Sequence, residues 1–225
     1  MEDVASDRLQ SVLEGIAKAA IVAGRKPDEI TLVAVTKTVP LERILPLLQA
    51  GIQHVGENRV QEMMTKSAAI RSQTPAIKLH LIGPLQSNKA KKAVETFDII
   101  QTLDRWDLAQ DLNRHAAALQ KIQECLVQVK ISDEPSKSGL APAALPEFLN
   151  QVTALPNLKI RGLMGIPPQA ATGDAARPYF ATLRSLHERS NLEILSMGMS
   201  SDFETAIQEG ATMVRLGTIL FGSRQ

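Results

Sequence analysis

The sequence predicts an α/β protein whose parallel strands close into a single (β/α)8 barrel. Short β-branched, apolar runs alternate with longer helical patterns along most of the chain, which is typical of repeated strand–helix units. Such units form either an open doubly wound sheet or a closed barrel, and eight strand-like runs favour the barrel. The chain has 225 residues, fewer than the ~250 typical of this fold, so its loops must be short.

The elements follow in a regular order after an opening helix predicted at 6–23, whose apolar stripe runs from Leu9 to Ala20. The predicted strands cover residues 31–36, 53–56, 78–82, 98–103, 125–131, 159–165, 193–197 and 212–216. The helical patterns between them cover residues 41–50, 59–72, 89–96, 105–121, 142–154, 175–190 and 203–209. Loops at 133–139 and 166–168 follow strand ends and are expected on the active face.

Composition narrows the classes of function. The 44% apolar and 22% charged residues are ordinary for a globular protein, and residues 1–225 are expected to form one domain. With 25 Lys and Arg against 24 Asp and Glu, the formal charge of +1 does not indicate a nucleic acid or membrane partner. Small-molecule chemistry remains, and the apolar stripes can all be satisfied within one barrel, which favours a monomer.

The location follows from cysteine usage and from the first residues. The lone cysteine, Cys125, cannot form an intramolecular disulfide, and it lies in a strand-like run where an inert buried thiol is expected. The chain start lacks the basic and apolar regions of a secretory signal, and no stretch approaches the ~20 apolar residues that cross a bilayer. We therefore expect a cytoplasmic protein.

Lys37 closes the first strand-like run and is the first candidate for chemistry. Because side chains alternate along a strand, Val33, Val35 and Lys37 share one face, which would point into the barrel. An ammonium at the mouth of an apolar strand is partly desolvated, which lowers its pKa and suits Schiff-base chemistry. Taken alone, however, the run favours a lysine that snorkels to solvent.

The segment 196–202 has the small, hydroxyl-rich composition of an anion-binding turn. Ser200 and Ser201 precede the helix predicted at 203–209, where a serine would cap the helix and face an anion. An ordinary helix cap is the simpler interpretation of this segment alone. Barrels often bind phosphate on the loops after strands seven and eight, however, and Gly217 and Thr218 follow the eighth strand.

An amine and a phosphate cup in one barrel mouth suggest pyridoxal 5'-phosphate (PLP). Arg215 lies in an apolar run, where a guanidinium needs an anion or a ring acceptor. An ion pair with Glu193 or Asp202 is an equally open interpretation. If Arg215 faces the pyridine nitrogen, it keeps that nitrogen unprotonated and weakens the ring as an electron sink.

Three further residues are weaker candidates. Asn58 would either hydrogen-bond the ring oxygen or begin a helix, and Met164 would pack in the core or against the ring, with the core favoured. His80 is expected to be a core histidine. The four histidines show no metal-ligand spacing, so no metal site is predicted.

Six motifs together carry a resemblance. They are Val35-Thr36-Lys37, HVGENRVQE at 54–62, HLIGPLQSNK at 80–89, RGLM at 161–164, SMGMSSD at 196–202 and VRLGTILFG at 214–222. The chain resembles the YggS/PROSC family of PLP-binding homeostasis proteins over about residues 5–223. The resemblance implies a barrel of PLP fold-type III, similar to the N-terminal domain of alanine racemase and without its C-terminal β-domain.

The resemblance also implies roles for residues at matching positions. Lys37 would form the internal aldimine, and Ser200 or Ser201 would hold the phosphate together with Gly217 and Thr218. Arg215 would approach the ring or the phosphate. The family has no established catalytic activity and is linked to vitamin B6 supply and to amino-acid and keto-acid balance.

Other sequence features agree with binding without turnover. A racemase needs a second acid–base group, a tyrosine from its C-terminal domain, whereas this sequence ends at Gln225 and its only tyrosine, Tyr179, is placed in a predicted helix. Lys137 is a second loop amine that would either capture the aldehyde during delivery to apo-enzymes or, as favoured, remain solvated. The alternatives left open are a small PLP-dependent racemase, a Schiff-base aldolase and a regulatory partner protein.

Overall fold

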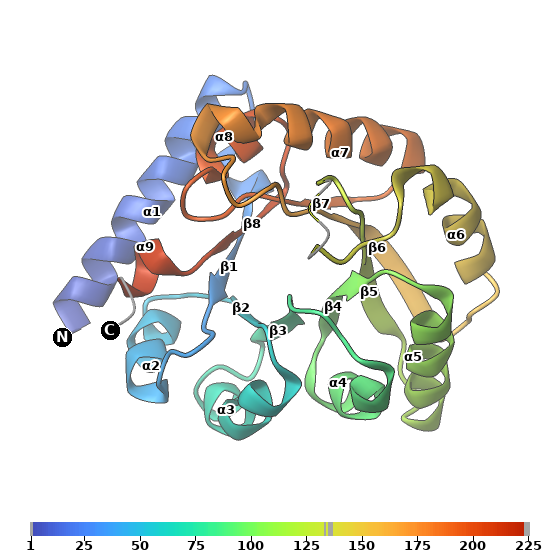
Figure 1. The fold of residues 1–225 in the computed structure, drawn as a ribbon. Coiled ribbons are helices and arrows are strands. Elements are labelled where there is room, and N and C mark those ends of the chain that lie inside the picture. Colours follow the sequence, from blue (N-terminus) through green and yellow to red (C-terminus); the bar gives the residue numbers. More distant parts are fainter. Residues whose placement is uncertain (1, 133, 135–136, 223–225) are drawn as a thin grey trace.

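A computed structural model describes residues 2–132, 134 and 137–222, and its strands form a closed parallel barrel in chain order (Figure 1). The barrel closes where β8 pairs with β1. The strands are β1 Thr31–Val35, β2 His54–Glu57, β3 Lys78–Leu81, β4 Ile99–Leu103, β5 Gln123–Gln128, β6 Leu158–Met164, β7 Ile194–Ser196 and β8 Met213–Leu216. The predicted (β/α)8 barrel is confirmed.

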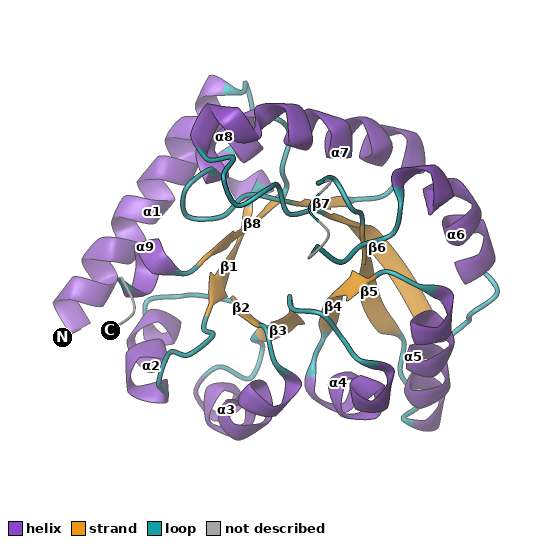
Figure 2. Cartoon of the chain, in the orientation of Figure 1, coloured by secondary structure: helices purple, strands orange, loops and turns teal. Residues whose placement is uncertain are grey.

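Helices surround the ring of strands (Figure 2). They are α1 Glu2–Val22, α2 Leu41–Gln49, α3 Val60–Gln73, α4 Ala90–Thr96, α5 Trp106–Ala118, α6 Leu145–Val152, α7 Arg177–Ser190, α8 Phe203–Gln208 and α9 Thr218–Phe221. Short 3-10 turns occupy Pro27–Glu29, Ser87–Lys89, Pro142–Ala144 and Gly173–Ala176. The opening helix, α1, packs across α8 and α9 on the outside of the barrel. No helix in the described part of the chain is long and apolar enough to span a membrane.

The strand alternation divides the core into two regions. Leu32 and Ala34 of β1 belong to the large apolar layer between strands and helices. Val33 is not part of this layer and points into the barrel. Its Cγ1 lies 2.9 Å from the place that a Cβ on Gly56 of the adjacent strand would take. Inside the barrel a small apolar cluster of Ile99, Leu126 and Met164 accompanies buried polar side chains.

The ends of several elements are shifted by a few residues from the sequence prediction, and two differences bear on the carboxyl face. The fifth strand was expected at 125–131 but ends at Gln128, because the backbone then pairs with a returning segment: Leu140 N–H donates to Gln128 O, and Lys130 N–H donates to Leu140 O. The short helix α9 after β8 was not predicted, because one turn is too short to show a periodic pattern. Of the predicted loop at 133–139, residues 133, 135 and 136 lie outside the described residues.

Candidate functional site

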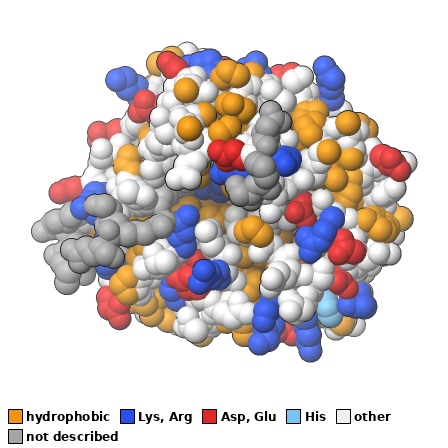
Figure 3. All heavy atoms as spheres, viewed as in Figure 1, with side chains coloured by type: hydrophobic (Ala, Val, Ile, Leu, Met, Phe, Trp, Pro, Cys, Tyr) orange, Lys and Arg blue, Asp and Glu red, His pale blue; other side chains and the backbone are white. Residues whose placement is uncertain are grey.

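A cavity of about 840 Å³ opens at the carboxyl ends of the strands. Figure 3 shows the face of the barrel viewed in Figure 1, where Lys and Arg side chains border a central hollow. The described residues that line the cavity are Val35, Lys37, Thr38, Val39, Arg43, Asn58, Ile82, Gly83, Pro84, Ile166, Met199, Ser200, Ser201, Arg215, Gly217, Thr218, Phe221 and Gly222. This is the face where the sequence placed the site.

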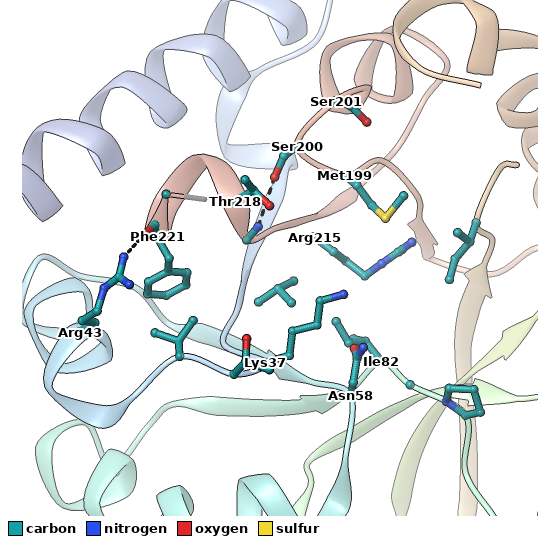
Figure 4. Close-up of a pocket in the computed structure, with 18 residues that line it drawn as sticks. Lys37, Arg43, Asn58, Ile82, Met199, Ser200, Ser201, Arg215, Thr218 and Phe221 are labelled. Atoms are coloured by element: carbon teal, nitrogen blue, oxygen red, sulfur yellow. Dashed lines mark hydrogen bonds between the residues drawn. The ribbon is translucent and has the colours of Figure 1, made fainter. Parts of the chain in front are cut away.

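Seven of the eight residues predicted to bind the cofactor line this one cavity. They are Lys37, Asn58, Ser200, Ser201, Arg215, Gly217 and Thr218. Lys37 lies in the turn after β1 and points into the cavity, with the Arg215 guanidinium and Asn58 near the end of its side chain (Figure 4). Its neighbour Val35 also lines the cavity, as the alternation along β1 predicts.

Met164 is the predicted residue that the structure does not place on the cavity wall. Its side chain is fully buried inside the barrel against Ile99 and Leu126. It lies at the last position of β6, and the cavity wall on this side is formed by Ile166, two residues further along the chain. The core interpretation of Met164 therefore fits the structure better than a ring contact.

The turn that carries Lys37 is held in an unusual backbone conformation. Thr38 has a φ of 61°, which a β-branched residue rarely adopts. Its N–H donates to Glu62 Oε1 of α3 at 2.6 Å. A side chain from the next helix thus holds the backbone directly beyond the lysine.

Lys66 of α3 holds the other side of the same turn. Its ammonium donates to the carbonyl oxygen of Thr36 at 3.0 Å, to Glu57 Oε1 at 2.9 Å and to Glu62 Oε1 at 2.8 Å. We call Glu57, Glu62 and Lys66 the turn clamp. Because it bonds Thr36 and Thr38, it holds the two residues that flank Lys37.

The two carboxyl groups of the turn clamp have opposite pKa shifts. Glu57 is fully buried, and this desolvation raises its pKa although Lys66 opposes the shift. Burial also acts to raise the pKa of Glu62, but the hydrogen bonds from Lys66 and from the Thr38 N–H outweigh it and lower the pKa. Lys66 is therefore the group that keeps charge at Glu57 tolerable in the interior.

The hydroxyl groups gather where the β7 and β8 loops meet. Ser200 Oγ accepts from the N–H groups of Gly217 and Ile219, each at 3.4 Å, while Ser201 and Thr218 line the cavity beside it (Figure 4). Gly198, at a φ of 94°, allows this path, since a Cβ there would lie 2.6 Å from Ala206 Cβ.

The expected serine cap on the helix after β7 is absent. Asp202 is the N-cap residue directly before α8, and it makes no side-chain cap. Instead its carboxylate turns back, accepting from the Met199 N–H at 2.7 Å and from the Ser201 hydroxyl at 3.2 Å. Ser200 is thus turned toward the β8 loop, because the Asp202 carboxylate shapes the turn before α8.

Arg215 is buried at the floor of the cavity. Nη1 donates to Ser196 Oγ at 2.7 Å, and Nη2 donates to the carbonyl oxygen of Gly165 at 3.0 Å. Burial lowers its pKa to about 10, with the charge of Asp202 acting in the opposite direction. Arg215 therefore remains a cation at neutral pH. Of the two acids considered as its partners, Glu193 pairs with Arg161 and Asp202 acts only through its charge.

Asn58 and His80 are placed by their strands. Asn58 lies between β2 and α3 rather than in the helix, and its N–H donates to Glu57 Oε2 at 2.9 Å. Gly83 allows it to sit there, because a Cβ on Gly83 would lie 2.2 Å from Asn58 O. His80 is fully buried inside the barrel, as predicted, and does not line the cavity.

The sequence reasoning missed Arg43, Phe221 and the turn clamp. Arg43 lies in the first turn of α2 and donates to the carbonyl oxygen of Phe221, and both residues wall one side of the cavity. Arg43 follows the first strand by a short loop, so a search of helix starts at the carboxyl face would have found it. The turn clamp has no comparable signal, since Lys66 resembles any surface residue of an amphipathic helix.

The groups on the cavity wall fit a phosphorylated aldehyde. They combine a lysine amine, hydroxyl and backbone N–H donors for an anion, and a buried guanidinium. Among the described residues that line the cavity, none is Asp, Glu, His, Cys or Tyr. No group of three or more possible metal ligands occurs in the described part of the chain. The wall therefore favours an anion with an electrophilic carbon.

Comparisons with known proteins agree with this chemistry. Residues 16–225 match the family described as alanine racemase, N-terminal domain. A pyridoxal phosphate homeostasis protein of Aquifex aeolicus is 41% identical, covering 98% of this chain and 99% of its own length. PipY of Synechococcus elongatus, solved with PLP bound, has a TM-score of 0.84 and 39% identity, covering 97% of this chain and 100% of its own.

A more distant structure shows the same fold. Alanine racemase from Bartonella henselae has a TM-score of 0.76 at 14% identity, with 99% of this chain matched to 59% of that one. At this identity the likeness concerns the barrel alone. The Aquifex aeolicus protein and PipY match nearly the whole chain at 41% and 39% identity, so they identify the family as well as the fold. This chain belongs to the YggS/PROSC family of pyridoxal phosphate homeostasis proteins, within the alanine racemase N-terminal domain family.

Proposed function

We propose that this chain is a single-domain, monomeric, cytosolic carrier that binds PLP covalently through Lys37 and delivers it to apo-enzymes. The observation that carries this proposal is the meeting of Lys37 with the hydroxyl groups of Ser200, Ser201 and Thr218 in one cavity. The PLP-bound structure of PipY and the homeostasis names of the curated relatives support the choice of ligand. PLP supplies an aldehyde to an amine when bound.

Each group on the wall has a definable part in this binding. Lys37 would hold the cofactor through its amine, which could condense with the aldehyde and release one water molecule. The hydroxyl groups and the Gly217 N–H would hold the phosphate, and the Arg215 guanidinium on the same cavity wall would contact the ring. As a cation that only donates, Arg215 does not protonate a ring nitrogen, which weakens the ring as an electron sink.

The absence of a second acid–base group on the described wall supports binding rather than turnover. Racemisation needs two groups that move a proton on opposite sides of one carbon. Besides Lys37, the basic side chains on the described wall are Arg43 and Arg215, and a guanidinium group donates hydrogen bonds but accepts none. Tyr179 lies on α7 and packs against the outer core. Such a wall suits storage and exchange of cofactor.

The proposal is tested by absorbance spectroscopy of the purified protein and of Lys37→Ala after incubation with PLP. We expect a visible band in the wild type, PLP retained through gel filtration, and loss of both in Lys37→Ala. The matched control is Lys137→Ala, since Lys137 lies on the loop after β5 and its ammonium is 3.7 Å from Glu134. We expect this control to keep the band.

Other outcomes point to other functions. A wild type that stays colourless and retains no PLP would contradict the proposal and favour an aldolase or a partner protein. A band that survives in Lys37→Ala and disappears in Lys137→Ala would move the covalent site to the β5 loop. Conversion of L-alanine to D-alanine by the PLP-loaded wild type, absent from Lys37→Ala, would favour the racemase alternative.

A further inference from the structure

A line of hydrogen bonds runs through the inside of the barrel and ends on Arg215. Ser196 Oγ accepts from Arg215 and lies 2.7 Å from Gln101 Oε1. Gln101 Nε2 lies 2.9 Å from His80 Nδ1, and His80 Nε2 lies 2.9 Å from His54 Nδ1. We call Ser196, Gln101, His80 and His54 the axial chain. Its members come from four strands or strand ends that are far apart in sequence.

The direction of every bond in the axial chain follows from Arg215. A guanidinium can only donate, so Ser196 accepts from it, and the hydroxyl hydrogen of Ser196 must go to Gln101 Oε1, which can only accept. The Gln101 amide nitrogen then donates to His80 Nδ1. All bonds therefore point away from the cavity.

This direction selects one form of both histidines. His80 Nδ1 accepts, so neutral His80 carries its hydrogen on Nε2 and donates it to His54 Nδ1. His54 in turn must keep Nδ1 unprotonated. The axial chain is thus complete only when both rings are neutral.

Only His54 has contact with the outside. Ser196, Gln101 and His80 are fully buried, whereas His54 is half-buried and lines a cavity of about 280 Å³ at the end of the barrel opposite the main cavity. A solvent proton therefore reaches the axial chain at His54. The other end of the same chain holds Arg215 at the cofactor cavity.

Protonation of His54 conflicts with the observed arrangement. A proton on Nδ1 must donate to His80 Nε2, which forces the His80 hydrogen onto Nδ1 and requires the Gln101 amide to turn over. The amide nitrogen would then donate to Ser196, whose own hydroxyl hydrogen would lose its acceptor in a fully buried place. The chain therefore has two discrete arrangements, and only one suits Arg215 as observed.

Charged groups around His54 both raise and lower its pKa. Lys78 on β3 lies beside it in the register of the sheet, Asp98 precedes β4 and is paired with Arg71, and Asp28 lines the same small cavity. Burial, followed by the charge of Lys78, lowers the pKa of His54, while Asp98 opposes the shift. The pKa of His80 is lowered well below its usual value by burial and by His54 and Lys78.

We propose that the axial chain positions Arg215 for PLP and that protonation of His54, on the opposite side of the barrel, weakens PLP binding. This inference rests on the proposed function. By reciprocity, bound PLP must disfavour protonated His54 by the same factor. We expect a factor of about ten, which equals a lowering of the His54 pKa by about one unit when PLP binds.

The experiment follows the ring nitrogens of the four histidines by NMR in wild-type protein, with and without PLP, between about pH 5 and 8. In parallel, PLP affinity is measured across the same range for the wild type and for His54→Gln. Glutamine keeps an acceptor for His80 but cannot titrate. The matched control is His115→Gln on α5, away from the axial chain.

We expect His80 to carry its hydrogen on Nε2, the His54 pKa to fall on PLP binding, and the ring signals of His115 to be the same with and without PLP. Between the upper and lower ends of the pH range, affinity should fall about tenfold more in the wild type and in His115→Gln than in His54→Gln. PLP bound with a visible band but with an unshifted or non-titrating His54 would overturn the inference alone. Failure of the wild type to bind PLP at all would overturn the proposed function instead.

Discussion

Two buried polar networks reach the cofactor cavity, and they differ in charge. The turn clamp combines a lysine with two carboxyl groups beneath the Lys37 turn. The axial chain is built from neutral groups and meets a charge only at Arg215. The first holds backbone atoms of Thr36 and Thr38, whereas the second holds one side chain.

The difference shows how a barrel can position two basic side chains of one cavity in different ways. Lys37 is positioned through the backbone of its two neighbours, Thr36 and Thr38, which the turn clamp bonds. Arg215 is positioned through its guanidinium, with two of its donors committed to Ser196 and Gly165. The two basic residues are thus supported in different ways, one through neighbouring backbone atoms and the other through its own side chain.

Breaking the turn clamp should have the largest effect on stability. Lys66→Met leaves Glu57 buried without its counter-ion, which costs about 3–5 kcal/mol of unfolding free energy, measured by urea denaturation. Lys91→Met, at an exposed position of α4, is the control and should change this free energy by less than about 0.5 kcal/mol. In Lys66→Met with Glu57→Gln, much of the loss should return. A single variant as stable as the wild type would contradict the role of Lys66.

Removing the Ser200 hydroxyl should lower the affinity for PLP and leave the stability of the fold largely unchanged. Ser200→Ala should reduce PLP affinity by about 2 kcal/mol, or about thirtyfold, because a hydrogen bond to a charged group is lost. Affinity for pyridoxal, which lacks the phosphate, should not change. Binding is measured by absorbance titration. The control is Ser72→Ala, at an exposed position of α3. An equal loss for both ligands would mean that Ser200 does not hold the phosphate.

Acidification should lower the unfolding free energy through the histidines of the axial chain, by less than the loss of the turn clamp does. His54 and His80 have lowered pKa values in the fold, so their contribution to stability is present above about pH 6.5 and is lost as the pH falls below it. Each histidine that stays neutral while folded contributes a slope of about 1.4 kcal/mol per pH unit. The measurement compares urea unfolding at about pH 7.5 and 5.5.

Between these two pH values, His54→Gln should lose less unfolding free energy than the wild type, by up to about 1.4 kcal/mol. His115→Gln is the control and should behave as the wild type. If His54→Gln and the wild type lose the same stability on acidification, His54 is not held neutral by the fold. That result would also weaken the case for the axial chain.

The barrel could be predicted from the sequence alone, as could seven of the described residues that line the cavity. Alternating strand and helix patterns are encoded locally, and parallel strands in a closed barrel bring all their carboxyl ends to one face. Residues at those ends, such as Lys37, Asn58 and Thr218, could therefore be placed together from their positions alone. Period-two alternation places Lys37 on the same side as Val33 and Val35, but the strand alone favoured a lysine that snorkels to solvent, and the loops after the seventh and eighth strands were needed to place it in the cavity.

The hydrogen-bond partners of the buried polar groups could not be predicted from the sequence and became visible in the folded structure. Ser196 and Gln101 are 95 residues apart, and Lys66 meets Thr36 across 30 residues, so no local pattern marks either contact. The same holds for Met164, whose position at a strand end did not reveal whether it faces the cavity or the layer beneath. Periodicity tells which side of a strand a residue occupies, whereas depth and bonding partners depend on which strands and loops meet there.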